Sequence, residues 1–236
     1  DLTRLLIGSE GTLGLITELT VKLHGIPESI ASGICSFPSI EGACNAVIAT
    51  IQFGVPVARI ELLDAAQVRA CNQYSGLSLP EETLLLLEFH GTENSVREQS
   101  ELFGEIAAEY TPRSFNWTTD PIERAKLWKA RHDAFWAAMA LLPGCEGMST
   151  DVCVPISRLA ECVEETRRDI EEIGIVAPIV GHVGDGNFHT LPMALPDDVE
   201  SWNRIKRFSE RLCERAISMG GTCTGEHGIG QGKIEY

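Results

Sequence analysis

The chain has 236 residues, a hydrophobic content of 44% and a formal net charge of −15. This length and hydrophobicity allow one large domain with a sizeable core and exclude global disorder. The acidic charge balance argues against nucleic-acid binding, which needs a basic surface, and no apolar run reaches the ~18 residues of a membrane span.

Eight cysteines are scattered through apolar segments, and none of them form a C-x-x-C pair. A free cysteine in such a segment behaves as a small core residue. We therefore expect reduced thiols in an intracellular protein, without an iron–sulfur cluster or a zinc ribbon. No signal peptide is visible, and a chain that begins at Asp1 is expected to belong to a longer protein.

The N-terminal stretch is rich in glycine, with three glycines in residues 8–14. Such a segment lets the backbone approach a ligand closely, although a plain Gly-rich turn is the simpler interpretation. Alternating apolar residues predict a strand at 15–23. The sequence Gly25-Ile26-Pro27 then predicts a boundary.

From residue 28 onward, strand and helix patterns alternate. Apolar periodicity and capping residues predict a strand at 31–37, a helix at 39–53, a strand at 57–62, a helix at 64–73, a strand at 83–89, a helix at 95–110 and a strand at 113–117. This order predicts an α+β fold, a ferredoxin-like split βαβ sandwich. The helix at 64–73 is an addition between the second and third strands of that fold.

The C-terminal half predicts long helices at 120–142, 157–173 and 197–219. Asp120 and Pro121 supply a helix start, and Gly220-Gly221 supplies a helix end. Residues 147–154 are expected to be extended. Residues 175–183 and 187–193 are expected to form a hairpin that carries two histidines.

The turn of this hairpin sets the expected positions of the histidines. Asp185-Gly186 favours a two-residue turn, because both turn positions need positive φ. Counting outward places His182 opposite His189, with Cβ atoms roughly 5 Å apart. Two imidazoles at that separation can bind one metal ion, whereas ordinary polar residues on a hairpin are the alternative interpretation.

A Gly-rich segment about 40 residues downstream favours the metal-binding interpretation of the two histidines. His182, His189 and Glu226 would give two imidazoles and one carboxylate, which suits zinc or manganese and leaves positions open for substrate. His227 would point the other way in an extended segment, so we interpret it as an acid or base. Asp185 is a competing carboxylate, but the turn already gives it a structural role.

The expected site suits an anionic 2-hydroxy acid, bound through its hydroxyl and one carboxylate oxygen. A metal lowers the pKa of the hydroxyl, and a neutral histidine can take the proton. The α-hydrogen must leave as a hydride, which no side chain accepts, so a redox cofactor is required. Residues 26–236 contain no dinucleotide fingerprint.

Several segments resemble the FAD-linked oxidases of the vanillyl-alcohol-oxidase type. Ile7–Thr17 is similar to the closing segment of their FAD-binding domain, and the rest resembles their C-terminal, substrate-side domain. The other matching segments, in family order, are Leu127–Arg131, Ser149–Pro155, His182–His189 and Gly221–Gly230. These segments look closest to the cytochrome-linked D-lactate dehydrogenases, with the glycolate oxidase D subunit and D-2-hydroxyglutarate dehydrogenase as more distant relatives.

The resemblance implies that residues 1–25 are the edge of an FAD-binding domain and that residues 26–236 form a substrate and metal domain. It implies oxidation of D-lactate to pyruvate with hydride transfer to FAD, held mainly by the rest of the FAD-binding domain, and a cytochrome or quinone as electron acceptor. This chain alone is then expected to be inactive. A non-catalytic metal-binding assembly module is the alternative from another class.

The resemblance also implies roles for individual residues. His182, His189 and Glu226 match the metal ligands, and His227 matches the catalytic base. Arg131 matches the arginine that binds the substrate carboxylate, a bidentate task that suits guanidinium, with a surface helix charge as its alternative interpretation. The residues that match backbone near the flavin are Gly8, Ser9, Glu10, Gly11, Thr12, Gly14 and Ile16.

One departure bears on the substrate. The 2-hydroxyglutarate enzymes carry a Lys-Tyr pair where this chain has Ser149-Thr150, so a second carboxylate would lose a partner. This difference favours a small monoacid such as lactate. The resemblance leaves open a homodimer, and a location in the bacterial cytoplasm, with or without peripheral contact to the inner membrane, or in the mitochondrion of a eukaryote.

Overall fold

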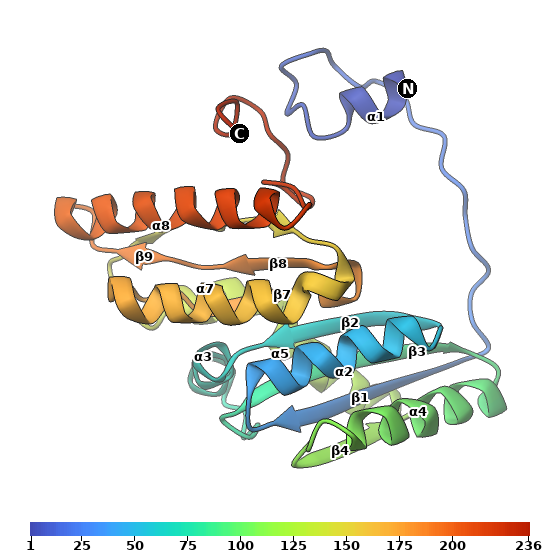
Figure 1. Cartoon of the computed structure of the whole chain (residues 1–236). Helices are drawn as coiled ribbons and strands as arrows, with labels where there is room; N and C mark the ends of the chain where they lie inside the picture. The colour runs from blue at the N-terminus through green and yellow to red at the C-terminus, as the bar shows by residue number, and fades with distance from the viewer.

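A computed structural model describes residues 1–236, and its N-terminal half is a ferredoxin-like unit (Figure 1). The four strands lie in the order β4-β1-β3-β2, and each neighbouring pair is antiparallel. The strands are β1 (Ser29–Phe37), β2 (Val57–Leu63), β3 (Thr83–Gly91) and β4 (Ser114–Thr118). The connecting helices are α2 (Ile40–Gln52) and α4 (Glu93–Ala108), with α3 (Ala65–Ser75) added between β2 and β3. This arrangement confirms the predicted split βαβ sandwich with its extra helix.

Side-chain caps fix where the helices of this unit begin. The Ser39 hydroxyl accepts a hydrogen bond from the backbone N–H of Gly42, and the Asp64 carboxylate accepts one from Gln67. Each cap satisfies a donor that has no partner inside the helix. The predicted helix starts are therefore confirmed.

The C-terminal half extends the same sheet beyond β2. Strand β7 (Ile179–Gly181) pairs with β2, β8 (Asn187–Thr190) pairs with β7, and β6 (Val152–Cys153) pairs with β8, which gives seven strands. A separate two-stranded sheet joins β5 (Glu146–Gly147) to β9 (Met193–Ala194). The extension brings the histidine hairpin against β2, more than 100 residues earlier in the chain.

Helices cover both faces of the sheet. A core of 33 buried residues lies on the side of α2, α4, α7 (Leu159–Ile173) and α8 (Val199–Ser218). A second core of 14 residues lies on the side of α3, α5 (Pro121–His132) and α6 (Ala134–Met139). Because successive side chains of a strand point to opposite faces, Leu85 and Leu87 join the first core and Leu84 and Leu86 the second. No helix is long and apolar enough to cross a bilayer.

The histidine hairpin does not have the predicted register. The observed partner of His189 is Val180, not His182, and Val183–Asp185 form a short 3-10 turn. Only Gly186 has a positive φ there, at 77°. A Cβ at Gly186 would lie 2.1 Å from the carbonyl oxygen of Val154. Close packing of the turn against Val154, which lies far earlier in the chain, therefore shapes a wider turn than Asp-Gly alone predicts.

Two other predicted elements differ from the structure. The helix expected at 120–142 is divided at Asp133, whose carboxylate accepts a hydrogen bond from Ser75 on α3. The strand expected at 15–23 is absent, and the Leu15 side chain there is 87% exposed. A strand needs a neighbour that satisfies its backbone groups, and no segment of this chain pairs with residues 15–23.

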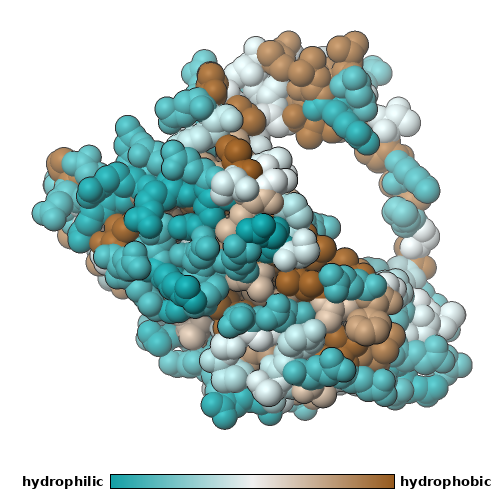
Figure 2. Space-filling model, viewed as in Figure 1, coloured by the Kyte–Doolittle hydropathy of each residue, from teal (hydrophilic) through white to brown (hydrophobic).

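The N-terminal segment runs back toward the C-terminus (Figure 1). Helix α1 (Leu2–Leu6) and the following turn lie beside the last residues of the chain, and the Gly8 carbonyl accepts a hydrogen bond from the Ile229 N–H at 2.8 Å. Apolar side chains gather on this segment, as the brown surface in Figure 2 shows. The segment thus approaches the functional loop described next.

Candidate active site

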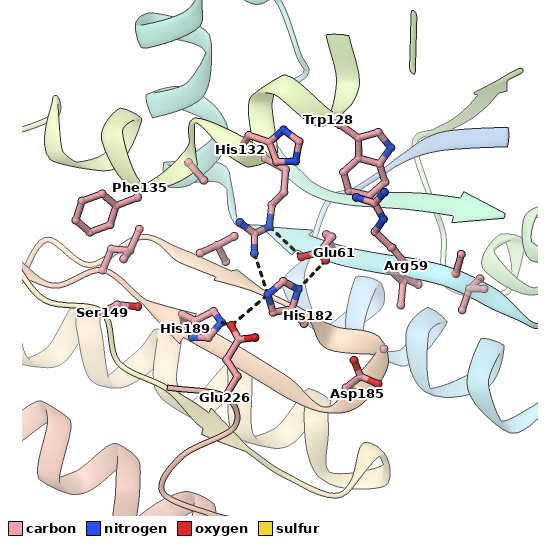
Figure 3. Close-up of a pocket in the computed structure, with 18 of the residues that line it drawn as sticks. Arg59, Glu61, Trp128, His132, Phe135, Ser149, His182, Asp185, His189 and Glu226 are labelled. Carbon is pink, nitrogen blue, oxygen red and sulfur yellow. Dashed lines mark hydrogen bonds and ion pairs between the residues drawn. The ribbon is translucent and has the colours of Figure 1, made fainter. Parts of the chain in front are cut away.

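A cavity of about 620 Å³ lies where β2, α5, α6 and the histidine hairpin meet (Figure 3). It collects the predicted ligands and the predicted acid–base and carboxylate-binding residues from segments far apart in the sequence. Its titratable lining residues are Arg59, Glu61, Arg131, His132, His182, Asp185, His189, Glu226 and His227. Apolar lining residues that include Ile60, Phe135, Val180 and Leu191 complete the wall.

Two imidazoles converge on one carboxylate in this cavity. His182 Nε2 lies 3.3 Å from Glu226 Oε1, and His189 Nε2 lies 3.1 Å from the same oxygen. The three donor atoms lie within 4.8 Å of one another. Two imidazole nitrogens and one carboxylate oxygen form a donor set that suits zinc or manganese.

The other nitrogen of each ring is already used. His189 Nδ1 donates to the carbonyl oxygen of Thr150 at 3.0 Å, and His182 Nδ1 lies 2.7 Å from Glu61 Oε1. A carbonyl can only accept, so the proton of neutral His189 is on Nδ1 and the Nε2 lone pair faces Glu226. Such second contacts are typical of histidines that bind metals. Two imidazole nitrogens and one carboxylate oxygen this close together can bind a single ion, so the residues fit a metal ion.

The surroundings shift the two histidines in opposite directions. The hydrogen bond to Glu61 raises the pKa of His182, whereas burial lowers the pKa of His189. His189 is thereby held in the neutral form that a metal ligand requires.

Asp151 organises the loop that carries Glu226 and His227. Its Oδ2 accepts hydrogen bonds from the backbone N–H groups of Gly225, Glu226 and His227 at 2.8, 2.9 and 2.8 Å, and from the Thr224 hydroxyl at 2.7 Å. Burial raises the pKa of the Asp151 carboxyl, but these hydrogen bonds outweigh burial and hold the pKa well below its usual range. The loop is therefore wrapped around a carboxylate and is not an extended strand.

His227 does not point away from Glu226 as the sequence predicted. Its ring stacks on His189, with centroids 4.9 Å apart and planes 9° apart, and its Nε2 lies 4.0 Å from Glu226 Oε1. The expectation failed because it assumed an extended backbone, whereas three consecutive N–H groups turn toward Asp151. His227 nevertheless lines the cavity and is 42% exposed in its side chain.

Arg131 is a cavity residue rather than a free surface charge. Its Nε donates to Glu61 Oε2 at 2.9 Å, and its Nη2 lies 3.3 Å from His182 Nε2. Sequence reasoning missed Glu61 and did not recognise what Asp151 does. The signal for Glu61 was a carboxylate inside the apolar strand Ile60–Leu63, because a charged residue there must have a buried partner.

The residues expected near a flavin lie outside this cavity. Gly8 accepts hydrogen bonds from the loop after His227, and Glu10 approaches Gly230. Gly14 and Ile16 lie further along the exposed N-terminal segment. The predicted flavin-side residues thus begin next to the loop that carries Glu226 and His227.

Comparison with known proteins identifies the family. Residues 26–236 match the family model described as FAD linked oxidases, C-terminal domain. The chain belongs to the FAD-linked oxidase family. It is 52% identical over 233 residues to "Probable D-lactate dehydrogenase, mitochondrial" of Danio rerio, and the match covers 99% of this chain and 47% of that protein. It is 44% identical over 236 residues to "D-lactate dehydrogenase [cytochrome], mitochondrial" of Arabidopsis thaliana, which covers 100% of this chain and 42% of that protein.

The fold of this FAD-linked oxidase domain is also found in solved structures. Alkyldihydroxyacetonephosphate synthase superposes with a TM-score of 0.64 at 15% identity, over 94% of this chain and 46% of that one. At this identity the likeness concerns the fold alone. The chain spans about half the length of the curated relatives it matches.

Proposed function

We propose that this chain is the substrate- and metal-binding half of an FAD-dependent D-2-hydroxy-acid dehydrogenase that oxidises D-lactate to pyruvate. The observation that carries the proposal is the convergence of His182, His189 and Glu226 beside Arg131 in one cavity. The two D-lactate dehydrogenases named above support D-lactate as the substrate. They also support a mitochondrial location and, for the Arabidopsis relative, a cytochrome as the electron acceptor.

The metal in this proposal is zinc or manganese, held by His182, His189 and Glu226. When bound, the metal supplies a Lewis acid for the substrate hydroxyl, and FAD supplies the acceptor for the α-hydride. FAD is held mainly by a domain outside this chain, with residues 8–16 at its border.

The side chains of this chain bind the substrate and move its proton. Arg131 binds the substrate carboxylate, because Glu61 holds its Nε and leaves the Nη groups toward the cavity. His227 takes the proton of the hydroxyl, with its ring placed by the stack on His189 and by its backbone bond to Asp151. Phe135 and Leu191 supply apolar wall for the methyl group of lactate and help to exclude water.

The first prediction is that metal removal abolishes D-lactate oxidation. The full-length flavoprotein is treated with a chelator, and its D-lactate turnover is measured with an artificial electron acceptor before and after zinc or manganese is returned. We expect loss and recovery of turnover while the flavin absorbance stays constant. The kcat/KM for D-lactate should exceed that for D-2-hydroxyglutarate, because Ser149 gives a second carboxylate no cation. It should also exceed that for glycolate, which lacks the methyl group that the Phe135 and Leu191 wall accommodates.

Two outcomes would contradict the proposal. Full turnover after the metal has been removed, shown by elemental analysis, would refute the metal site. A metal-loaded flavoprotein that oxidises none of the three acids would favour the alternative, a non-catalytic metal-binding module.

A further inference from the structure

Glu61 is a buried carboxylate that contacts both His182, a proposed metal ligand, and Arg131, the proposed carboxylate-binding residue. It lies in β2, is 5% exposed, and is flanked by the core residues Ile60 and Leu62. A carboxylate at this depth is stable only if its oxygens are paired. One oxygen is paired with His182 and the other with Arg131, at 2.7 and 2.9 Å.

The two contacts act on different groups. The contact with Oε1 keeps the proton of His182 on Nδ1, so that the Nε2 lone pair faces Glu226. The contact with Oε2 holds Arg131 at Nε, and Nη2 of the same guanidinium lies 3.3 Å from His182 Nε2. One carboxylate therefore fixes the distance between a metal-facing nitrogen and a guanidinium edge. A dashed line in Figure 3 marks the contact of Glu61 with His182.

We propose that Glu61 is a positioning residue that couples the metal ligand His182 to the carboxylate-binding Arg131. The inference rests on the proposed function, because it assigns a metal to His182 and a substrate carboxylate to Arg131. A 2-hydroxy acid offers its hydroxyl and carboxylate on adjacent carbons. It can use both groups at once only if the metal and the guanidinium stay at a fixed, short separation.

The chain offers a matched control in Glu88. This carboxylate is 3% exposed on the neighbouring strand β3, and it also pairs with one arginine and one histidine, Arg59 at 2.9 Å and His90 at 2.7 Å. Glu88 does not line the cavity; its partner Arg59 does, but Arg59 is also held over the Trp128 ring, with its guanidinium carbon 4.5 Å from the ring centroid. A change to glutamine there removes an equally buried charge without touching His182 or Arg131.

The second prediction compares Glu61→Gln with Glu88→Gln in the full-length protein. Zinc or manganese affinity is measured by competition with a chelator, and kcat and KM for D-lactate are measured on samples saturated with metal. Glu61→Gln should weaken metal binding by about 10- to 100-fold. It should also lower kcat/KM by roughly 10- to 100-fold, mainly through a higher KM. Glu88→Gln should change neither.

A double mutant separates the two contacts. In an Arg131→Ala background, Glu61→Gln should still weaken metal binding but should raise KM no further, because residues that act through one another are not additive. If Glu61→Gln does not fold, Glu61→Asp, which withdraws the carboxylate by one methylene, should show the same two losses.

A Glu61 variant with wild-type metal affinity and wild-type KM would overturn the positioning role, and so would an equal loss in Glu88→Gln. A wild-type protein that holds no metal would overturn the proposed function and this role with it. A metal-binding wild type that matches its Glu61 variant would overturn the role of Glu61 alone.

Discussion

Single hydrogen bonds determine what the two imidazoles of the cavity can do. Each Nδ1 has a partner, so each Nε2 faces Glu226. The His227 ring has no hydrogen-bond partner of this kind, and it stacks on the His189 ring instead. The three histidines therefore differ in role because of their neighbours, although they are chemically identical.

The third prediction concerns His227 and Glu226 in the full-length protein. His227→Asn should lower kcat for D-lactate by about 10²–10⁴-fold, the usual cost of removing a general base, while metal content stays stoichiometric. Glu226→Gln should lower both metal content and activity. Metal is measured by elemental analysis, and turnover with an artificial electron acceptor.

His90→Asn is the control for His227→Asn, because His90 lies outside the cavity. Metal content must be measured in this variant, because His227 Nε2 lies 4.0 Å from the proposed ligand atom Glu226 Oε1. If His227→Asn loses the metal, His227 is a ligand, and the assignment of a base to it is wrong.

At the scale of elements, the loop from Thr224 to His227 is shaped by the carboxylate of Asp151, which directly precedes β6. Its Oδ2 accepts hydrogen bonds from three consecutive backbone N–H groups of the loop. Such a group of N–H donors is a recognised anion-binding arrangement. Gly225 is required there, because a Cβ would lie 1.8 Å from the Asn187 amide nitrogen.

The fourth prediction is a pH-dependent cost of Asp151→Asn. The pKa of Asp151 is lowered in the folded state, so its ionised form contributes stability above the ordinary aspartate pKa of about 4. That contribution is lost as pH falls below about 4. The variant should lose about 1–3 kcal/mol at pH 7 and pH 5, measured by urea unfolding, and the difference should shrink near pH 3.

Asp197→Asn serves as the control for this prediction, because Asp197 is exposed just before α8. It should change the free energy of unfolding by less than ~0.5 kcal/mol. A cost of Asp151→Asn that stays constant down to pH 3 would show that its charge does not stabilise the loop.

At the scale of the whole molecule, one sheet joins two halves of the chain and one cavity lies at their junction. Strand β2 is the last strand of the ferredoxin-like unit and the first neighbour of the histidine hairpin. The helices on both faces bury most of the cysteines, as their apolar surroundings predicted. Six of the eight are buried, and only Cys145 and Cys153 are partly accessible.

The fifth prediction follows from this burial. Burial raises the pKa of the Cys35 and Cys162 thiols to about 12, so these thiols stay protonated at neutral pH and are shielded from reagents. Alkylation of the native protein at pH 8, mapped by mass spectrometry, should modify Cys145 and Cys153 first. All eight thiols should react in urea, and rapid native labelling of Cys35 would contradict the packing described.

The family resemblance named His182, His189, Glu226, His227 and Arg131, which all line the cavity. The sequence by itself determined the order of strands and helices from β1 to β4 and the helix starts at Ser39 and Asp64. These features depend on local periodicity, on capping and on residue chemistry, which act over a few neighbouring residues. Only the tertiary structure decided the hairpin register, the side to which His227 turns and the role of Glu61. Packing of Gly186 against Val154 and the bonds to Asp151 join segments far apart in the chain, and no local pattern contains them. The unpaired segment 15–23 shows the same limit, because an alternating pattern becomes a strand only where a neighbour accepts its backbone hydrogen bonds.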